Sequence, residues 1–393
     1  MLIFKKLTLT KTSIYIILLL IYSACGENIS TQVSLEDSSS TFSKLMKEAI
    51  DNSYNSIPGI SLSIKSAKLE NGWNGIYGYD STKKTDTLSV DQPFRIASIT
   101  KTFVATSILR LHEDGKLNIY DPISKYIDPI HIKILQADGY DPDKIQLYHC
   151  LTHTSGLFDY AMNGTEYGAM SKKEPQRRWT RTEQLQLAMD FGDPAGMPGE
   201  KYLYCDTGYI LLGEIIESFF EGDLARGLRT QIGFDSLGMD HTWLETLEPA
   251  PFGSQTQVKR YFGGDEVSSF DPSIDLYGGG GLVSTCDDLT IFLQALFNDK
   301  IFKHKSTLDL MLTQHNFNSD YDQDADPRFK DYRMGFWKVN IYGDDAYMHS
   351  GLWGTTFIHI PSQNSSFAVN FTKGWNNRLL KKSMLLVNNL NEE

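Results

Sequence analysis

The stretch from residue 94 to residue 102 reads Phe-Arg-Ile-Ala-Ser-Ile-Thr-Lys-Thr and sets Ser98 and Lys101 three residues apart. In a helix, residues at this spacing share one face, so the hydroxyl and the amine become neighbours. A serine becomes a nucleophile when a base takes its proton, and a lysine can be that base if its surroundings keep it neutral. A helix N-terminus also favours an oxyanion forming beside the serine. The stretch therefore predicts a nucleophilic serine at the start of a helix.

The S-x-x-K pattern alone is weak, because roughly one or two chance matches are expected in a chain this long. Ser81 and Lys84 form such a second match, but they stand in a polar stretch with no apolar helix after them. Ser98 is followed by Val104, Ile108 and Leu111, which have the spacing of a buried helical stripe. The alternative for Ser98 is a helix cap, so its distant partners must decide.

Size and charge restrict the class of protein. The 393 residues, 41% of them hydrophobic, can bury a large core in one large domain or two. Residues 26–393 carry 34 basic and 49 acidic side chains, a formal charge of −15. This balance argues against nucleic acid or an anionic membrane surface as a partner. Cys150, Cys205 and Cys286 are odd in number and widely spaced, so buried thiols are favoured over disulfides.

The N-terminus has the pattern of an export signal, with three lysines before an apolar run at 14–22 and then Ser-Ala-Cys25. Nine apolar residues are too few for a permanent membrane span. The residues before Cys25 resemble a bacterial lipoprotein box, although Tyr22 stands where a leucine is usual. We expect a signal peptide at 1–25, lipid attachment at Cys25 and a location in the periplasm or cell envelope. Cleavage after Ala24 without a lipid, or a retained anchor, are the alternatives.

The rest of the chain predicts a tether at 26–41 and one domain at 42–393. Helical patterns occur at 42–54, 287–297 and 377–390. Alternating patterns predict strands at 59–65, 73–79, 332–341, 346–350, 355–360 and 366–371. Strands at both ends around a helical middle favour an α+β fold, in which terminal helices flank an antiparallel sheet. The α/β part would comprise 42–97 and 278–393. An inserted, mainly α part at 98–277 would form the other wall of an active-site cleft.

Two further motifs supply partners for Ser98. Tyr204-Cys-Asp206 precedes an apolar helical run, and its phenol could shuttle protons if a cation such as Lys101 lowered its pKa. His349-Ser350-Gly351 ends a predicted strand, where a side chain can face a cleft and a backbone N–H can point at an oxyanion.

These motifs, in this order and spacing, resemble the three boxes of the class C β-lactamase family, which includes DD-peptidases, esterases and D-amino-acid peptidases. The stretches at 151–157, 237–239 and 279–285 resemble its framework, and the similarity covers about residues 42–390. The resemblance implies that Ser98 is acylated and that Lys101 and Tyr204 handle its proton. It implies substrate binding by Asp206, His349, Ser350, Gly351 and Leu352, with the Ser98 and Leu352 N–H groups as the oxyanion hole. It implies no cofactor.

Two positions depart from the pattern. Asp206 stands where an asparagine is usual, and a carboxylate cannot donate a hydrogen bond to a substrate carbonyl. It could instead pair with Lys101, which would favour the charged amine and weaken it as a base. His349 stands where β-lactamases of this class carry a lysine, and a mostly neutral imidazole attracts a substrate carboxylate less. Both changes argue against efficient hydrolysis of β-lactams or of D-Ala-D-Ala ends.

Three other patterns could indicate a metal site or a nucleophile, but each favours a structural role. His149 and His153 have a metal-binding spacing, but no acid completes the set. The aspartates between 320 and 331 partly mimic a calcium loop, with Ala325 where glycine is needed. Ser155 is not part of a G-x-S-x-G elbow, so a structural turn is favoured. We expect no metal.

The sequence therefore predicts an exported serine hydrolase that cleaves an ester, amide or peptide bond through an acyl-enzyme on Ser98. Its partner would be a small-molecule or peptide substrate. One alternative is a penicillin-binding DD-peptidase acting on cell-wall peptides. The other is a binding or scaffold protein that keeps the fold without catalysis, for which Asp206 is the motivation.

Overall fold

The computed structural model describes residues 35–52, 57–161, 166–315 and 331–390. The predicted signal peptide, most of the predicted tether, Cys25 and the calcium-like loop up to residue 330 lie outside these ranges. The helices that organise the fold are α1 (Leu35–Asp51), α2 (Thr100–Glu113), α3 (Pro129–Ala137), α4 (Leu147–Leu151), α5 (Glu166–Lys173), α6 (Arg181–Phe191), α7 (Asp206–Ser218), α8 (Leu224–Ile232), α9 (Phe234–Leu237), α10 (Cys286–Phe297), α11 (Lys305–Met311) and α12 (Asn377–Asn388). The strands are β1 (Gly59–Ser66), β2 (Leu69–Gly78), β3 (Phe94–Arg95), β4 (Trp243–Leu244), β5 (Tyr261–Phe262), β6 (Asp265–Glu266), β7 (Leu282–Ser284), β8 (Trp337–Ile341), β9 (Asp344–Gly351), β10 (Thr355–Ile360) and β11 (Ser365–Phe371).

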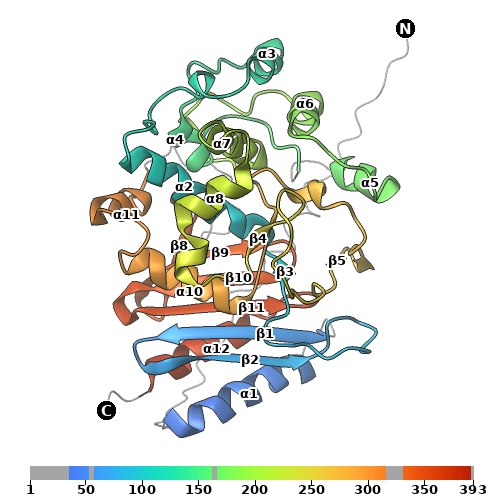
Figure 1. The fold of residues 1–393 in the computed structure, drawn as a ribbon, viewed down its shortest axis with the longest axis vertical. Coiled ribbons are helices and arrows are strands. Elements are labelled where there is room, and N and C mark those ends of the chain that lie inside the picture. The colour runs from blue at the N-terminus through green and yellow to red at the C-terminus, as the bar shows by residue number, and fades with distance from the viewer. Residues whose placement is uncertain (1–34, 53–56, 162–165, 316–330, 391–393) are drawn as a thin grey trace.

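A six-stranded antiparallel sheet forms the lower half of the molecule in Figure 1, in the order β2-β1-β11-β10-β9-β8. The first strands pair with the last, since Ile60 lies opposite Phe371 in the β1–β11 ladder. The inner strands β10 and β11 are buried along their whole length. Such continuous burial requires covered faces on both sides of the sheet.

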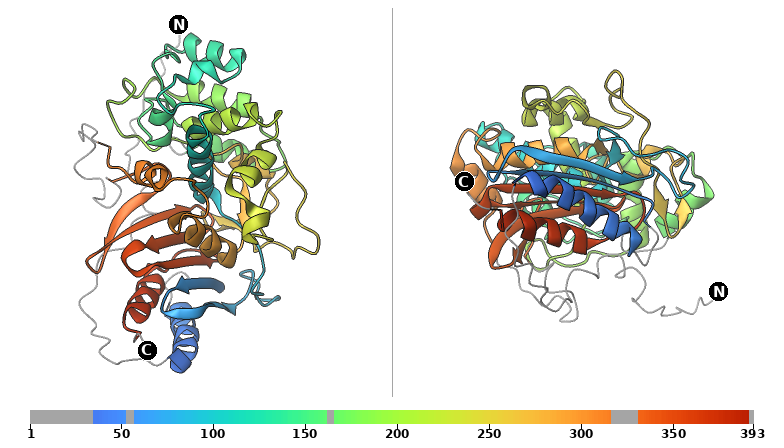
Figure 2. Two further views of the ribbon diagram at one scale, coloured as in Figure 1. Left: turned by 60° about the vertical axis from the view of Figure 1, so that its left-hand side comes forward. Right: turned by 90° about the horizontal axis from the view of Figure 1, so that it is seen from below.

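Helices α1 and α12 cover one face of the sheet, and Figure 2 shows them side by side beneath it. Their apolar residues, Phe42, Met46 and Val387 among them, pack with β1 and β11 in one core cluster. Helix α10 covers the other face and contacts β1, β10 and β11. Its N-cap, Thr285, accepts a hydrogen bond from the Asp288 N–H at 3.2 Å.

The helical middle of the chain forms the upper half in Figure 1. Helix α2 is buried from Thr100 to Leu109 and packs against α7 and α8. A three-stranded sheet in the order β3-β7-β4 also lies here, and its strand β3 leads directly into the turn before α2. The fold is thus of the α+β class, with an antiparallel sheet, flanking terminal helices and an inserted helical part, as predicted.

Some boundaries differ from the predictions. Helix α1 begins at Leu35 rather than residue 42, so the end of the predicted tether is helical. Strand β8 begins at Trp337 rather than residue 332. Cys150, Cys205 and Cys286 are free and buried, as expected. No helix within the described residues is both long enough and apolar enough to cross a membrane.

Candidate active site

Ser98 lies in a short 3₁₀ turn, Ala97–Ile99, between β3 and α2. The residues on either side are buried, whereas Ser98 is partly exposed. Its side chain does not cap the helix, because no side-chain cap hydrogen bond forms at this helix start. Ala97 has a φ of +45°, a strained backbone conformation for an alanine. Strain of this kind is concentrated at functional sites, where the surrounding structure maintains it.

The Lys101 side chain is the centre of the site. It is fully buried, and its Nζ donates a 3.0 Å hydrogen bond to Ser98 Oγ. Nζ also lies 2.6 Å from the Gly279 carbonyl oxygen and 2.5 Å from Asp206 Oδ1. An ammonium has three N–H groups, and three acceptors from three segments of the chain surround this one. The resting arrangement is therefore that of a charged amine.

Asp206 begins helix α7, and its side chain is 10% exposed. Its backbone N–H donates to Asp159 Oδ1 at 2.7 Å, which anchors the start of the helix. The ion pair with Lys101 is the arrangement that the sequence raised as a possibility for a carboxylate at this position.

Tyr204 lies beside the same amine, with Lys101 Nζ 5.0 Å from its ring centroid. Its hydroxyl is buried and makes no hydrogen bond of regular geometry. Burial and the charge of Asp206 raise the pKa of Tyr204 well above its usual value, although contact with Ser98 lowers it slightly. The condition under which the sequence allowed a proton shuttle, a lowered phenol pKa, is therefore not met, because burial and the charge of Asp206 raise it. The hydroxyl stays protonated and can act as a donor close to Ser98.

His349 is fully buried at the end of β9. Its Nδ1 lies 2.9 Å from the Ser350 carbonyl oxygen, so Nδ1 carries the proton and donates. Its Nε2 then accepts from the Tyr332 hydroxyl at 3.3 Å. Burial, followed by the charge of Lys101, lowers the pKa of His349 to about 3, so the ring is neutral. Both ring nitrogens contact protein groups, and a substrate-binding role for this residue remains a prediction.

The segment after His349 passes close to the nucleophile. A Cβ placed on Gly351 would lie 2.0 Å from the Ile96 carbonyl oxygen, so only glycine lets β9 approach the turn that carries Ser98. The Ser350 hydroxyl pairs with Thr356 Oγ1 at 3.1 Å. Leu352 is partly buried and packs against the cluster formed by Ala97, Val267 and Trp353. The structure thus brings the three predicted motifs together, with the oxyanion hole still a prediction.

Four residues of this site were not predicted from the sequence. Gly279 supplies a carbonyl acceptor to Lys101. His153 accepts the Cys205 N–H on Nδ1 at 3.0 Å and lies 4.2 Å from the Tyr204 ring, so it supports the Tyr204 segment. Tyr332 contacts His349. Asp275 lies behind Gly280 and accepts from Trp353 Nε1 at 3.3 Å. The glycine run and the stretch at 151–157 were signals for two of them, whereas Asp275 and Tyr332 belong to no recognised motif.

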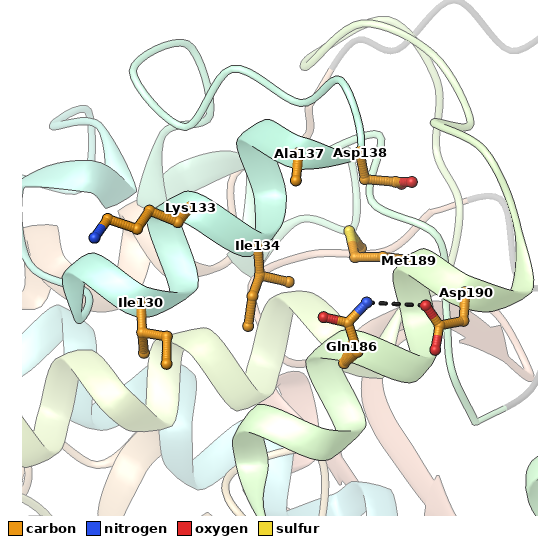
Figure 3. Close-up of a pocket in the computed structure, with 8 residues that line it drawn as sticks. All are labelled: Ile130, Lys133, Ile134, Ala137, Asp138, Gln186, Met189 and Asp190. Atoms are coloured by element: carbon orange, nitrogen blue, oxygen red, sulfur yellow. Dashed lines mark hydrogen bonds between the residues drawn. The ribbon is translucent and has the colours of Figure 1, made fainter.

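The alternative sites have structural roles. Ser81 is buried at a bend after β2, and its backbone carbonyl accepts the Lys84 N–H at 3.2 Å. His149 Nδ1 accepts the Gln146 N–H at 3.1 Å. The Ser155 hydroxyl accepts the Leu157 N–H at 3.3 Å. Within the described ranges, no three His, Cys, Asp or Glu side chains are placed to hold a metal. A cavity of about 280 Å³ lies between α3 and α6, lined by Ile134, Met189 and Asp190 among others, and none of its lining residues belongs to the site (Figure 3).

Curated relatives are similar over much of the chain. A teichoic acid D-alanine hydrolase of Staphylococcus aureus is 26% identical over 265 residues, which is 66% of this chain and 58% of the relative. A D-aminopeptidase of Gluconobacter oxydans is 26% identical over 315 residues, 77% of this chain and 53% of the relative. The chain thus spans a little over half the length of the curated relatives it matches.

Solved structures share the fold. A D-amino acid amidase from Ochrobactrum anthropi SV3, complexed with L-phenylalanine amide, superposes with a TM-score of 0.72 at 22% identity and covers 90% of this chain and 99% of its own. A D-stereospecific amidohydrolase from Streptomyces sp. gives 0.71 at 22% identity, covering 88% and 98%. The family model described as Beta-lactamase matches residues 50–383. On this match over most of its length, and with the Ser98, Tyr204 and His349 motifs gathered at one site, the chain belongs to the Beta-lactamase family.

Proposed function

We propose that this protein is a serine hydrolase that cleaves an ester or amide of a D-amino acid through an acyl-enzyme on Ser98. The observation that carries the proposal is the 3.0 Å contact between Lys101 Nζ and Ser98 Oγ, with the Tyr204 phenol beside it. The names of the relatives support the substrate class. They are a teichoic acid D-alanine hydrolase, a D-aminopeptidase and a D-amino acid amidase, and each name refers to a D-amino acid or D-alanine group.

The ion pair dictates how a proton would leave Ser98. A lysine surrounded by three acceptors cannot accept a proton until it has lost one. Asp206 Oδ1, 2.5 Å away, is the nearest acceptor for that proton, and Lys101 would then take the serine proton as the Oγ–C bond forms. The protonated Tyr204 hydroxyl would donate to the leaving group and regain a proton from Lys101. Water would later hydrolyse the ester on Ser98, giving up a proton to the same groups as Ser98 Oγ regains its own.

The charge of the site disfavours the DD-peptidase alternative. D-Ala-D-Ala ends present a free carboxylate, whereas Asp206 is itself a carboxylate and His349 is neutral and buried. A cell-wall peptidase would acylate with penicillin and release D-alanine from a pentapeptide. We expect neither reaction at a rate comparable with hydrolysis of a D-aminoacyl ester.

The direct test is labelling with a fluorophosphonate, read by intact mass. We expect one adduct on the wild-type protein and none on Ser98→Ala. Ser81→Ala is a matched control, because Ser81 and Lys84 repeat the S-x-x-K spacing in the same chain. Equal labelling of wild type and Ser98→Ala would overturn the proposal. Absence of any adduct, with esters and β-lactams included, would favour the non-catalytic scaffold.

Export and lipid attachment at Cys25 are part of the proposal and rest on the pattern of residues 1–25. The test is metabolic labelling with an alkyne fatty acid in a bacterial host, followed by fractionation. Label should enter the wild type and be absent from Cys25→Ala, which should leave the membrane fraction. Label retained by Cys25→Ala would rule out this residue as the attachment site.

A further inference from the structure

Asp275 ends the 3₁₀ segment η4 (Pro272–Asp275) and is connected to the nucleophile by two routes. On one side its Oδ2 accepts the Trp353 Nε1–H at 3.3 Å, and Trp353 packs in one cluster with Ala97, the neighbour of Ser98. On the other side its Oδ1 lies against Gly280, where a Cβ would come within 1.9 Å of it.

The glycine run brings this carboxylate close to the Lys101 cluster. A Cβ on Gly279 would lie 3.4 Å from Asp206 Cγ, so Asp206 and Asp275 contact adjacent glycines. The Gly279 carbonyl accepts from Lys101. Asp275, Asp206 and the single amine therefore surround the same two-residue backbone segment beside Ser98.

Charge at this point is unbalanced in favour of the carboxylates. Lys101 is committed to Asp206 at 2.5 Å, and Arg95, the other cation that influences Asp275, is paired with Glu245 at 2.5 Å. Among the described residues no lysine or arginine forms an ion pair with Asp275, and the Trp353 N–H is a neutral donor. Burial, followed by the charge of Asp206, raises the pKa of Asp275 to about 6. Asp275 is partly exposed and has no cation paired with it in the described part of the chain, so a positively charged group of a ligand could fill that role.

The Tyr204 hydroxyl is a second polar group at the site. The Tyr204 hydroxyl is buried beside Ser98 and has no hydrogen bond of regular geometry. Buried polar groups are normally satisfied, so this hydroxyl is available to donate to a substrate bound at Ser98.

We propose that Asp275 is a specificity-determining residue that binds the α-ammonium of an aminoacyl substrate while its carbonyl is attacked by Ser98. The inference rests on the proposed function and names the recognition feature, a free ammonium next to the scissile bond. Substrates with a blocked amine lose this ion pair, and substrates with a free carboxylate at the same point are repelled.

The experiment compares D-alanine p-nitroanilide with its N-acetyl derivative on the wild type and on Asp275→Asn. Asparagine keeps the shape and an acceptor for Trp353 but has no charge. We expect wild-type kcat/KM to favour the free ammonium by about tenfold or more, the size of one charge-assisted hydrogen bond. In Asp275→Asn that preference should disappear because kcat/KM falls for the substrate with the free ammonium, while kcat/KM for the N-acetyl substrate stays the same. Asp265→Asn is the control, because Asp265 is an exposed aspartate with a surface partner, Lys172.

A binding measurement covers the case in which neither anilide is turned over. The aminoethylboronic acid of D-alanine configuration and its N-acetyl derivative are competed against fluorophosphonate labelling of Ser98. The inference is supported if the free-amine compound protects Ser98 from labelling, if Asp275→Asn weakens that protection, and if the variant does not change protection by the acetyl compound. Equal protection by both compounds, no protection by either, or equal losses in the variant would overturn it. Failure of fluorophosphonate to label Ser98 would instead count against the proposed function.

Discussion

At the scale of single residues, the site depends on how one buried amine is compensated. Lys101 is fully buried and contacts Ser98 Oγ, Gly279 O and Asp206 Oδ1. Of these only Asp206 carries charge. Burial of an ammonium is tolerated when an opposite charge and hydrogen bonds replace water, and it is costly when the opposite charge is removed.

We therefore predict that Asp206→Asn, which restores the amide usual at this position, destabilises the protein. Because asparagine still accepts a hydrogen bond, the loss should be about 1–3 kcal/mol, less than for an unpaired buried charge. Urea unfolding at pH 7 measures it. The control Asp265→Asn removes an exposed pair and should change stability by less than about 1 kcal/mol. Equal effects of the two variants would contradict the ion pair.

Tyr204 and Tyr209 give a matched pair. The Tyr204 hydroxyl has no regular hydrogen bond, whereas the Tyr209 hydroxyl donates to the Leu151 carbonyl at 2.9 Å. Tyr204→Phe should lower kcat by about 10²–10⁴, as expected for loss of a proton donor, with little change in the urea midpoint. Tyr209→Phe should instead destabilise the protein by about 1–2 kcal/mol, because a buried carbonyl loses its partner. The reverse pattern would mean that Tyr204 is structural.

Sequence reasoning identified Ser98, Lys101, Tyr204 and Asp206 because they stand in short ordered motifs. It could not settle the direction of the Tyr204 pKa, because burial depends on the whole fold and leaves no local signal. It missed Asp275 for a similar reason. That carboxylate reaches the site only because Gly279 and Gly280 leave room for two side chains from distant segments.

At the scale of elements, β9 is held against the turn that carries Ser98. The approach depends on Gly351, where any Cβ would collide with the Ile96 carbonyl oxygen. The elements near the end of the chain were predicted well, since the strand β10 and the helix α12 begin at the predicted residues. Strands β3, β4 and β7 were not predicted, because strands of two or three residues are too short to show an alternating pattern.

Gly351→Ala should separate β9 from the nucleophile. We expect a stability loss of about 1–3 kcal/mol from overpacking and a loss of acylation larger than the fraction unfolded explains. Gly168→Ala is the control, because Gly168 lies in α5 and its added Cβ would have its nearest neighbour at 3.9 Å. That change should be neutral or stabilise by about 0.5–1 kcal/mol. Thermal melts and fluorophosphonate labelling rates measure both variants.

At the scale of the whole molecule, the buried imidazoles couple stability to pH. Burial lowers the pKa of His349 and His359 to about 3 and of His315 to about 4, and that of His153 well below its usual value. Below pH 6.5 these imidazoles therefore bind protons in the unfolded chain and stay unprotonated in the folded chain. Stability supplied by these groups is present above pH 6.5 and is lost as pH falls toward 4.

Three carboxyls act in the opposite direction, and one of them is Asp138, whose pKa is raised by burial. Burial raises the pKa of Asp275 and Asp288 to about 6, so their contribution is present below pH 3.8 and is lost as pH rises through 6. Burial lowers the pKa of His149 as well. Five imidazoles outweigh three carboxyls by about two protons, and the unfolding free energy should fall by up to about 3 kcal/mol per pH unit between pH 6 and 4.

His359→Gln tests this linkage at a residue that forms no hydrogen bond or ring contact with Ser98, Lys101 or Tyr204. His359 stacks on Phe297 with ring centroids 4.0 Å apart and pairs with Ser366. Urea unfolding between pH 4 and 7 should show a slope reduced by about one proton, about 1.4 kcal/mol per pH unit. The variant should keep its hydrolytic activity at pH 7. A slope identical to that of the wild type would show that this imidazole does not contribute.

Complete burial of Lys101 has a consequence for chemical mapping of the protein. Reagents that acylate or reductively alkylate amines from water will modify surface lysines and leave this one untouched while the chain is folded. An inventory of accessible amines would thus omit the amine on which turnover is proposed to depend. Its late modification, timed against loss of turnover, would report when the interior of the crevice first opens to solvent.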